Sequence, residues 1–441
     1  MKTVVAKFGG TSLADADSFR HAADIVKSDP NRRYAVVSAP GKRHDRDHKI
    51  TDMLLMCYQL ASHQLQFEDV FDIIRGRFEE IKNGLGLTLP LKERLDDICG
   101  EIRRGASRDY CASRGEYVSA LLLAEHLGWP FVDSAELIRF DADGVLDAPE
   151  TDRLIKKRLA AVPNAVIPGF YGCGEQGEIL TFSRGGSDIT GALIARGTDA
   201  QLYENWTDVS GFLMADPRVV RDARPIRSVT YKELRELSYM GAQVLHEDAV
   251  FPVRQADIPI HIKNTRRPDD PGTLIVPKAL EKKDTILTGI AGRKDFCVIS
   301  VEKDRLREEE NFLRKLISVF ESNDVPIENM PAGIDSISVI VSQAHIHNKE
   351  KKLLEEIGIY CQPDNLAIMP SMALVAVVGH GMSREKGVAA RVFGALAGQG
   401  INIRMISQGA SELNILVGVE NRDFEQAVQA IYDAFVQGEE Q

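Results

Sequence analysis

Up to about residue 280, short apolar runs alternate with longer stretches in which apolar side chains recur every three or four positions. The short runs are rich in β-branched residues and predict buried strands, whereas the wider spacing predicts amphipathic helices. Strands are expected near 3–6, 34–41, 129–133, 165–170, 201–211 and 258–264. Strands that alternate with helices indicate an α/β fold, an open and mostly parallel sheet with helices on both faces. Such a sheet binds its ligand at the carboxyl ends of its strands.

Helices are expected at 13–27, 50–65 and 117–127, and residues 67–102 keep a helical, polar-faced pattern. This long stretch predicts a mostly α-helical lid or insertion. Glu116 stands at the expected entrance of the apolar helix 117–127. A glutamate there is either a functional group or a first-turn residue that complements the helix dipole.

The C-terminal part contains an internal repeat that follows a proline-rich connection at 264–285. Strand 298–301 matches 374–377, and the amphipathic helix 312–320 matches 388–396, with the same offset in both cases. Two such copies predict tandem ferredoxin-like α+β modules. The glycine-rich loop 379–383 suits a small ligand or a close partner chain. We expect domains at 1–280, 281–370 and 371–441, with the first strand of the last module contributed by residues near 285–293.

A first glycine cluster, Lys7-Phe8-Gly9-Gly10-Thr11-Ser12, lies between an expected strand and an expected helix. Glycines let the backbone approach an anion closely, and a helix N-terminus offers unpaired N–H groups. The lysine would add a cation, so the cluster predicts a phosphate-binding loop. It is not a Walker A loop, and a lone Gly-Gly pair by itself favours a tight strand-to-helix turn.

A second cluster, Ser183-Arg184-Gly185-Gly186-Ser187-Asp188, opens the helix expected at 189–196. Its arginine is suited to clamping a carboxylate with two parallel hydrogen bonds. Asp188 at the helix start also fits a simple N-cap. Two such loops, each following a strand, favour one shared site over two unrelated turns.

Composition narrows the possible partners. The chain is 44% hydrophobic and 27% charged, with a formal net charge of −11, which argues against nucleic acid or an anionic membrane as partner. No apolar run approaches the roughly 20 residues of a membrane span, and the first residues already predict a strand instead of a signal peptide. The six cysteines form no Cys-x-x-Cys pair and the histidines no metal-ligand spacing, which favours a reducing, cytoplasmic location.

Together these motifs closely resemble those of the aspartate kinases, members of the amino-acid-kinase superfamily with two C-terminal ACT regulatory domains. The resemblance covers essentially the whole chain and rests on four segments, 7–12, 183–188, 206–211 and 401–409. It implies that Mg²⁺ and ATP serve to phosphorylate the side-chain carboxylate of L-aspartate. The product would be 4-phospho-L-aspartate, the first intermediate of lysine, threonine and methionine biosynthesis.

The resemblance also implies roles for individual residues. Lys7 and the N–H groups of Gly9 and Gly10 would hold the transferring phosphoryl group, with Asp188 orienting the catalytic groups. Arg184 would bind a substrate carboxylate and Glu116 the substrate ammonium. Thr51 and Ser187 would add hydrogen bonds to the amino acid. The implied ATP-binding residues are Lys7, Phe8, Gly9, Gly10, Thr207, Asp208, Asp216, Pro217 and Arg218.

Regulation by lysine, threonine or both is implied as well, with a homodimer or homotetramer joined through the ACT domains. Leu213 and Gln243 depart from the family pattern near the nucleotide. In the first repeat, Glu308-Glu309-Glu310-Asn311 replaces the Arg384-Glu385-Lys386-Gly387 of the second. Asparagine tolerates left-handed backbone, so we expect the turn to survive without glycine. The three acidic residues either suit a basic effector such as lysine or form a solvated loop.

Two other functions are compatible with parts of the pattern. A kinase of the same fold with another acceptor, such as glutamate or an acylated derivative, is disfavoured by the paired ACT modules and by Trp206-Thr207-Asp208. A non-catalytic amino-acid sensor is disfavoured because Lys7, Asp188, Arg184 and Glu116 are all present.

Overall fold

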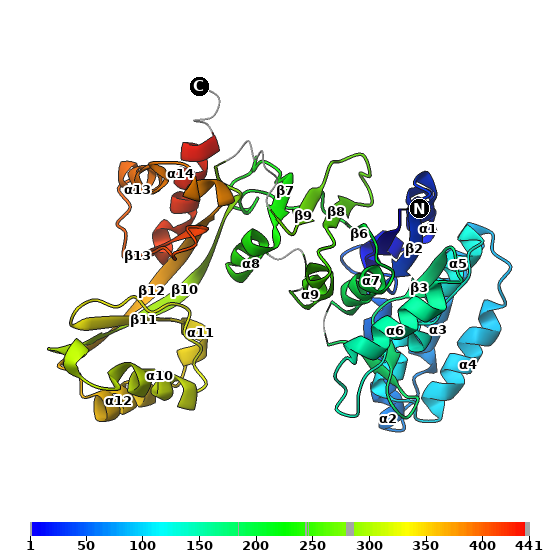
Figure 1. Cartoon of the computed structure of the whole chain (residues 1–441). Helices are drawn as coiled ribbons and strands as arrows, with labels where there is room; N and C mark the ends of the chain where they lie inside the picture. Colours follow the sequence, from blue (N-terminus) through cyan, green and yellow to red (C-terminus); the bar gives the residue numbers. More distant parts are fainter. Residues whose placement is uncertain (1, 184, 243–244, 246, 279–285, 437–441) are drawn as a thin grey trace. The chain divides into compact units, whose positions relative to one another are not determined.

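The computed structural model describes residues 2–183, 185–242, 245, 247–278 and 286–436 (Figure 1). They form two compact units. The first comprises the described residues within 1–212, 225–231 and 243–279, and the second those within 213–224, 232–242 and 280–441.

The first unit is built on a seven-stranded sheet in the order β3-β2-β1-β6-β8-β9-β7. The strands from β3 to β8 in this order are parallel, whereas β9 runs antiparallel to β8 and parallel to β7. The open, mostly parallel sheet expected from the sequence is therefore confirmed. The strands are β1 (Val4–Phe8), β2 (Arg32–Val37), β3 (Ala165–Pro168), β6 (Leu202–Thr207), β7 (Ser228–Thr230), β8 (Ile260–Asn264) and β9 (Thr273–Val276), with a separate hairpin of β4 (Tyr171–Cys173) and β5 (Ile179–Thr181).

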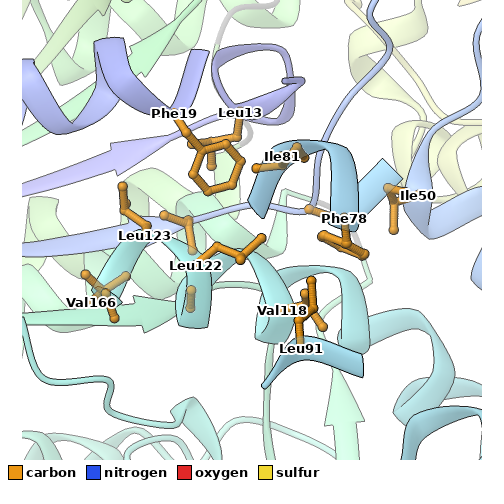
Figure 2. Packing of buried hydrophobic residues seen from close by; sticks show 14 of the residues in the cluster. Leu13, Phe19, Ile50, Phe78, Ile81, Leu91, Val118, Leu122, Leu123 and Val166 are labelled. Carbon is orange, nitrogen blue, oxygen red and sulfur yellow. The ribbon is translucent and has the colours of Figure 1, made fainter. Parts of the chain in front are cut away.

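The helices of this unit pack together and against the sheet to form its hydrophobic core. They are η1 (Gly10–Leu13), α1 (Ala16–Ser28), α2 (Ile50–Ser62), α3 (Glu68–Leu85), α4 (Leu91–Arg103), α5 (Arg108–Leu127), η2 (Ser134–Glu136), α6 (Ala148–Leu159), α7 (Gly186–Gly197) and α9 (Glu247–Gln255). Phe78 and Ile81 of α3 and Leu91 of α4 pack with Leu13 and Leu122 in one buried cluster (Figure 2). The predicted helical insertion therefore belongs to the main core and is not a separate lid.

Two local predictions were wrong. Residues 129–133 do not form a strand, because only Phe131 makes a bridge, to Val166. Gly128 ends α5 in the left-handed conformation and Pro130 has no N–H, so too few backbone groups remain for a ladder. Helix α5 begins at Arg108, capped by Ser107, and Glu116 therefore lies in mid-helix, not in a first turn.

The second unit contains one antiparallel sheet in the order β11-β10-β12-β14-β13. Its strands are β10 (Gly289–Glu302), β11 (Ser336–Ser342), β12 (Asn365–Val378), β13 (Met405–Ser407) and β14 (Asn414–Glu420). Its helices are α8 (Tyr231–Tyr239), η3 (Leu306–Glu308), α10 (Phe312–Ser322), α11 (Gln343–Ile346), α12 (Glu350–Cys361), η4 (His380–Ser383), α13 (Val388–Gly398), η5 (Asn421–Asp423) and α14 (Phe424–Val436).

The internal repeat is visible in this sheet. The offset from β10 to β12 equals the offset from α10 to α13, at the first residue of each element and at the last. The copies interleave, because residues 289–293 of β10 pair with 374–378 of β12, whereas 296–302 pair with β11 and with residues 365–372. Helices α10 and α12 lie at one end of the two long strands, and α13 and α14 at the other (Figure 1).

The turn before each repeated helix is left-handed. Asn311 precedes α10 with φ +66°, and Gly387 precedes α13 with φ +86°. The expectation that asparagine preserves this turn is confirmed. The loop 379–383 is packed against its own chain, since a Cβ on Gly379 or Gly381 would meet the Ile286 carbonyl oxygen at 2.5 or 2.7 Å.

Candidate functional site

The two glycine clusters meet at the carboxyl ends of the central strands. Lys7 is buried on β1, and its Nζ lies 2.5 Å from Oδ1 of Asp188 in the first turn of α7. The Asn205 amide on β6 donates to the same oxygen at 3.0 Å. The other polar atom of that amide, Oδ1, is buried and has no partner within the described part of the chain. A cation, a carboxylate and an amide thus form one cluster.

The first glycine loop is shaped by a close backbone approach. The Gly41 N–H donates to the Gly10 carbonyl at 2.7 Å, and a Cβ on Gly10 would lie 2.9 Å from the Ala39 carbonyl oxygen. The Gly9 N–H donates to the Trp206 carbonyl at 3.0 Å. The Gly9 N–H is already engaged, so the expectation that it binds phosphate does not hold in this structure.

Two aromatic residues of the recognised motifs have a structural role in the first unit. Phe8 is fully buried, and its ring stacks on Trp206 with centroids 6.3 Å apart. The Trp206 indole N–H donates to Glu204, which also pairs with Arg32. The Phe8 carbonyl also accepts from the Ser38 N–H at 3.1 Å, so the structure gives Phe8 a role in the core.

The second glycine loop begins α7 without a side-chain cap. Gly185 occupies the N-cap position with φ +60°, a left-handed conformation that favours glycine. The interpretation of Asp188 as an N-cap is therefore wrong, because its carboxylate is turned to Lys7 and Asn205. Ser187 is buried beside Gly169, where a Cβ would come within 2.6 Å of the serine hydroxyl. Arg184 lies outside the described residues.

Glu116 is a buried carboxyl group with unused hydrogen-bonding capacity. A backbone hydrogen bond from Ala39 reaches the carboxyl group, but its Oε2 has no partner among the residues described. Burial raises the pKa of Glu116 to about 8. The neighbouring Gly115 permits this depth, because a Cβ there would lie 2.6 Å from the Ala39 Cβ. A buried carboxyl with an unused oxygen is suited to receive a cationic group of a ligand.

Thr51 is half-buried at the second position of α2. The loop before it, residues 38–49, connects β2 to α2, and the Ile50 N–H donates to the Pro40 carbonyl at 3.4 Å. The same loop contains Ala39 and Gly41. Thr51, Glu116 and Gly10 therefore share one neighbouring segment.

A polar cavity of about 150 Å³ lies within the first unit beside the first glycine loop. Thr207 and Asp208, both predicted nucleotide residues, line it at the end of β6. The Ser12 and Thr265 hydroxyls bond to one another across it at 2.6 Å. Its further lining residues are Thr11, Ser18, His21 and Arg266.

Asp216, Pro217 and Arg218 belong to the second unit. Arg218 hydrogen-bonds Asp216, and this bond lowers the pKa of that carboxyl group. The structure thus brings two of these three predicted residues into contact with each other. Leu213 of the same segment is exposed, and Gln243 lies outside the described residues.

Sequence reasoning missed Asn205, Thr265 and Arg266. Each lies at or just after the carboxyl end of a strand, β6 or β8, where ligands of parallel sheets bind. That rule, applied to every strand end, would have found them. In the described part of the chain no group of three or more His, Cys, Asp or Glu side chains is placed to hold a metal ion. None of the helices described is long and apolar enough to span a membrane.

Comparison with known proteins places the chain in a family. The family model described as "Amino acid kinase family" matches residues 2–264, and the one described as "ACT domain" matches residues 375–435. Aspartokinase 3 of Bacillus subtilis is 33% identical over 98% of this chain and 99% of its own. The crystal structure of the Clostridium acetobutylicum aspartate kinase, described as an allosteric enzyme, matches with 49% identity and a TM-score of 0.91, covering 99% of this chain and 100% of that one.

The aspartokinase III of Escherichia coli is similar in two solved states. Its complex with aspartate and ADP, the R-state, has 28% identity and a TM-score of 0.72, covering 98% of this chain and 99% of that one. Its complex with lysine and aspartate, the T-state, has 27% identity and a TM-score of 0.73, covering 99% of this chain and 100% of that one.

Proposed function

The chain belongs to the aspartate kinases of the amino acid kinase family, and we propose that phosphoryl transfer takes place at the Lys7–Asp188 pair. An aspartate kinase is an ATP-dependent phosphotransferase, and this one carries the ACT region of an allosteric enzyme. The observation that carries the proposal is the buried contact of Lys7 with Asp188, which joins the two glycine loops.

In the proposed reaction a side-chain carboxylate oxygen of aspartate attacks the γ-phosphorus of ATP. A new O–P bond forms, the bond from phosphorus to the β–γ bridging oxygen breaks, and ADP leaves with that electron pair. The carboxylate is already ionised, so no general base is needed. Catalysis then depends on positioning and on neutralising phosphoryl charge. The Lys7 ammonium supplies that charge, Asp188 orients Lys7, and Asn205 orients Asp188.

Aspartate recognition is assigned to the residues around the buried Glu116. The free Oε2 of Glu116, which has no partner among the described residues, would accept a hydrogen bond from the substrate ammonium. This role would account for a carboxyl group buried at that position. Thr51 and Ser187 would add hydrogen bonds. The resemblance assigns the substrate carboxylate to Arg184.

Nucleotide binding is assigned to the polar cavity and to the loop around Gly10. A cavity of about 150 Å³ is smaller than the roughly 300–1,000 Å³ of typical ligand pockets, so it would take only part of a nucleotide. Thr207 and Asp208 suit hydroxyl groups, and the exposed guanidinium of Arg266 suits a phosphate. The resemblance adds Asp216, Pro217 and Arg218.

Mg²⁺ is proposed to arrive with ATP. Magnesium is usually held by one or two carboxylates together with phosphates and water, and the carboxylate at the cavity, Asp208, fits such a donor set. When bound, the ion would neutralise part of the phosphate charge.

For regulation we propose a lysine or threonine effector at the first repeat, in a homodimer or homotetramer joined through the ACT regions. The Escherichia coli relative was solved with lysine in its T-state. In this chain Glu309 pairs with Lys303 at 2.7 Å and with Lys315 at 3.5 Å, and Glu308 lies 3.9 Å from Arg305, so two of the three acidic charges already have a basic partner. All six cysteines are free thiols, which supports a cytoplasmic location.

The assignment is tested by trapping the acyl phosphate with hydroxylamine, using aspartate, glutamate and N-acetylglutamate as acceptors. We expect product with aspartate alone. The Asp188→Asn variant should lose most of that product while the protein stays folded, and Asp199→Asn, an exposed carboxylate shortly after α7, serves as its matched control. Full activity of Asp188→Asn would refute the proposed site.

A further inference from the structure

The loop formed by residues 38–49 is a shared support for three substrate-facing groups. Its Gly41 N–H binds the Gly10 carbonyl of the phosphate loop at 2.7 Å. Its Ala39 N–H binds the Glu116 carboxyl group. Its end leads directly into α2, where Thr51 is the second residue. A shift of this loop would therefore disturb both substrates at once.

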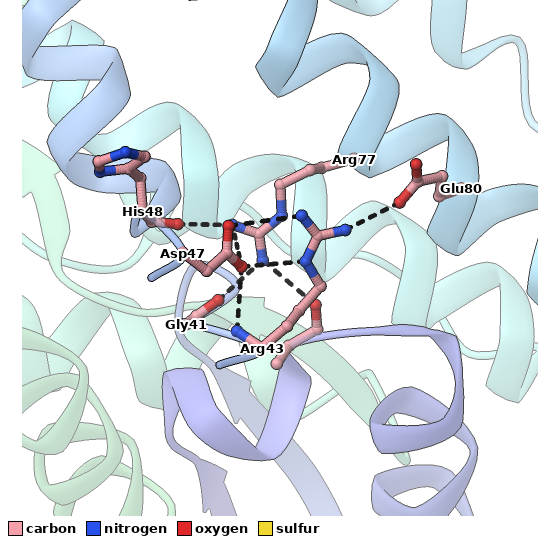
Figure 3. A network of polar contacts seen from close by, with 7 residues as sticks. Gly41, Arg43, Asp47, His48, Arg77 and Glu80 are labelled. Carbon is pink, nitrogen blue, oxygen red and sulfur yellow. Dashed lines mark hydrogen bonds and ion pairs between the residues drawn. The ribbon is translucent and has the colours of Figure 1, made fainter. Parts of the chain in front are cut away.

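Arg77 of α3 holds this loop from inside the protein (Figure 3). Its side chain is 4% exposed, and its guanidinium donates to three backbone carbonyls. Nη2 donates to the Gly41 carbonyl at 2.8 Å and to the Ala14 carbonyl at 3.3 Å, while Nη1 donates to the His48 carbonyl at 2.6 Å. The three carbonyls come from the start of the loop, from its end and from the turn after the phosphate loop.

A second arginine completes the network from the solvent side. Asp47 lies 3.5 Å from Arg77 Nη1 and accepts from the Arg43 Nε at 2.9 Å. Hydrogen bonds from Arg43 hold the pKa of Asp47 well below its usual range, so this carboxylate stays charged. Arg43 also pairs with Glu80 of α3 at 3.0 Å. Helix α3 therefore contacts the loop at three points. Arg77 binds the carbonyls of Gly41 and His48, and Glu80 pairs with Arg43.

Packing alone does not explain the choice of arginine. Burial lowers the pKa of Arg77, and its Nε is buried without a partner in the part of the chain that the structure describes. A buried ion of this kind often stabilises a protein less than an apolar side chain of the same size would. What the guanidinium supplies is a rigid planar fork with donors in fixed directions.

We propose that Arg77 is a positioning residue. By fixing the loop 38–49, it keeps Gly10, Thr51 and Glu116 in their positions relative to one another. The inference rests on the proposed function, in which these three groups face the substrates. Arg77 itself touches neither substrate. Its effect passes through the backbone carbonyls that it binds.

The test compares Arg77→Lys with Arg75→Lys by steady-state kinetics and thermal unfolding. Lysine keeps the charge but cannot reach all three carbonyls. We expect the kcat/KM for aspartate to fall about tenfold to a hundredfold in Arg77→Lys, because small misplacements cost that much. Arg75, two residues earlier on α3, pairs with Asp72 and Asp96 at the surface, and its variant should stay within about twofold of the parent.

A purely structural role gives a different result. The unfolding temperature would then fall, but the folded Arg77→Lys protein would keep the parent KM for aspartate, and this outcome would overturn the proposal. If Arg77→Lys does not fold, the aspartate KM of Arg43→Gln serves as the test instead, because this variant loses the ion pairs of Arg43 with Asp47 and Glu80. A parent-like aspartate KM in that variant would equally count against the idea.

Chemical rescue gives an independent test. Guanidinium ion at low millimolar concentration should restore part of the activity of Arg77→Ala. It should leave the activity of the control Arg75→Ala unchanged. The proposed function is checked separately with Glu116→Gln. An altered aspartate KM in Glu116→Gln beside a normal one in Arg77→Lys would reject the role of Arg77 alone, whereas normal values in both would reject the assignment of the aspartate site.

Discussion

The polar residues of the proposed site in the first unit differ from those of the acidic turn before α10 in the second. In the first, Lys7, Glu116 and Arg77 are buried, and their partners come from distant parts of the chain. In the second, the acidic residues 308–310 form the end of η3 and the turn after it, and Glu309 is paired with Lys303 and Lys315 nearby. Burying a charged side chain is costly unless it is paired and hydrogen-bonded, whereas an exposed charged side chain costs little. Substitutions of these buried, paired residues of the first unit should therefore change catalysis, and substitutions in the turn before α10 should leave it intact.

The largest effect is expected from Lys7→Ala. Loss of the ammonium removes charge stabilisation from the transferring phosphoryl group, so kcat should fall by at least about a hundredfold. Aspartate affinity, measured by calorimetry, should remain similar, since Glu116 and Thr51 are untouched. Lys27→Ala on α1 is the surface control. A parent-like kcat in Lys7→Ala would show that this buried residue of the first unit does not serve catalysis.

Glu116→Gln should raise the aspartate KM and change its pH dependence. The pKa of about 8 means that Glu116 is protonated below that pH in the free protein and must lose its proton to pair with an ammonium. The aspartate KM of the parent should therefore fall as pH rises from about 6.5 to about 8.5, and level off above the pKa. In Glu116→Gln, whose amide does not titrate, this dependence should be absent.

The same raised pKa has a consequence for stability. Between the usual value near 4.5 and about 8, the folded protein binds a proton at Glu116 that the unfolded chain releases. The contribution of this group to stability therefore declines as pH rises through that range and is constant above it. Chemical unfolding at several pH values should show a flatter profile for Glu116→Gln than for the parent. Identical profiles would mean that Glu116 titrates normally.

Arg266→Gln should weaken ATP binding about threefold, the size expected for an exposed charge contact. Arg266 lines the polar cavity, whereas its neighbour Arg267 is not among the lining residues. The two variants carry the same charge change one residue apart, so Arg267→Gln is a close control. An equal rise of the ATP KM in both would show that only the general charge matters.

The smallest effect is expected at the turn before α10. Asn311→Ala forces alanine into a left-handed conformation, which costs roughly 1–2 kcal/mol and should lower the unfolding temperature by a few degrees. Asn311→Gly should not lower it. Both variants should keep the parent kcat and KM values. A loss of activity in either one would show that this turn of the second unit does influence catalysis without an effector.

The sequence alone was sufficient for features that depend on local chemistry or on periodicity. The parallel sheet followed from β-branched runs alternating with helical spacing. The repeat followed from a constant offset between matching segments, which β10 and β12 preserve. The left-handed turn at Asn311 followed from the side chain itself. Each of these is set by contacts between residues close in the chain or by a pattern that recurs along it.

Tertiary contacts set the features that depend on burial and on distant partners. Glu116 was expected at a helix start, and the structure buries it in mid-helix with a raised pKa. The Gly9 N–H was expected to bind phosphate, and it binds Trp206 instead. Arg77 carried no sequence signal, because arginine on a helix is common, and Asn205 carried only its place near the carboxyl end of a strand. Their significance comes from groups far away in the sequence, which only the folded chain brings within hydrogen-bonding distance.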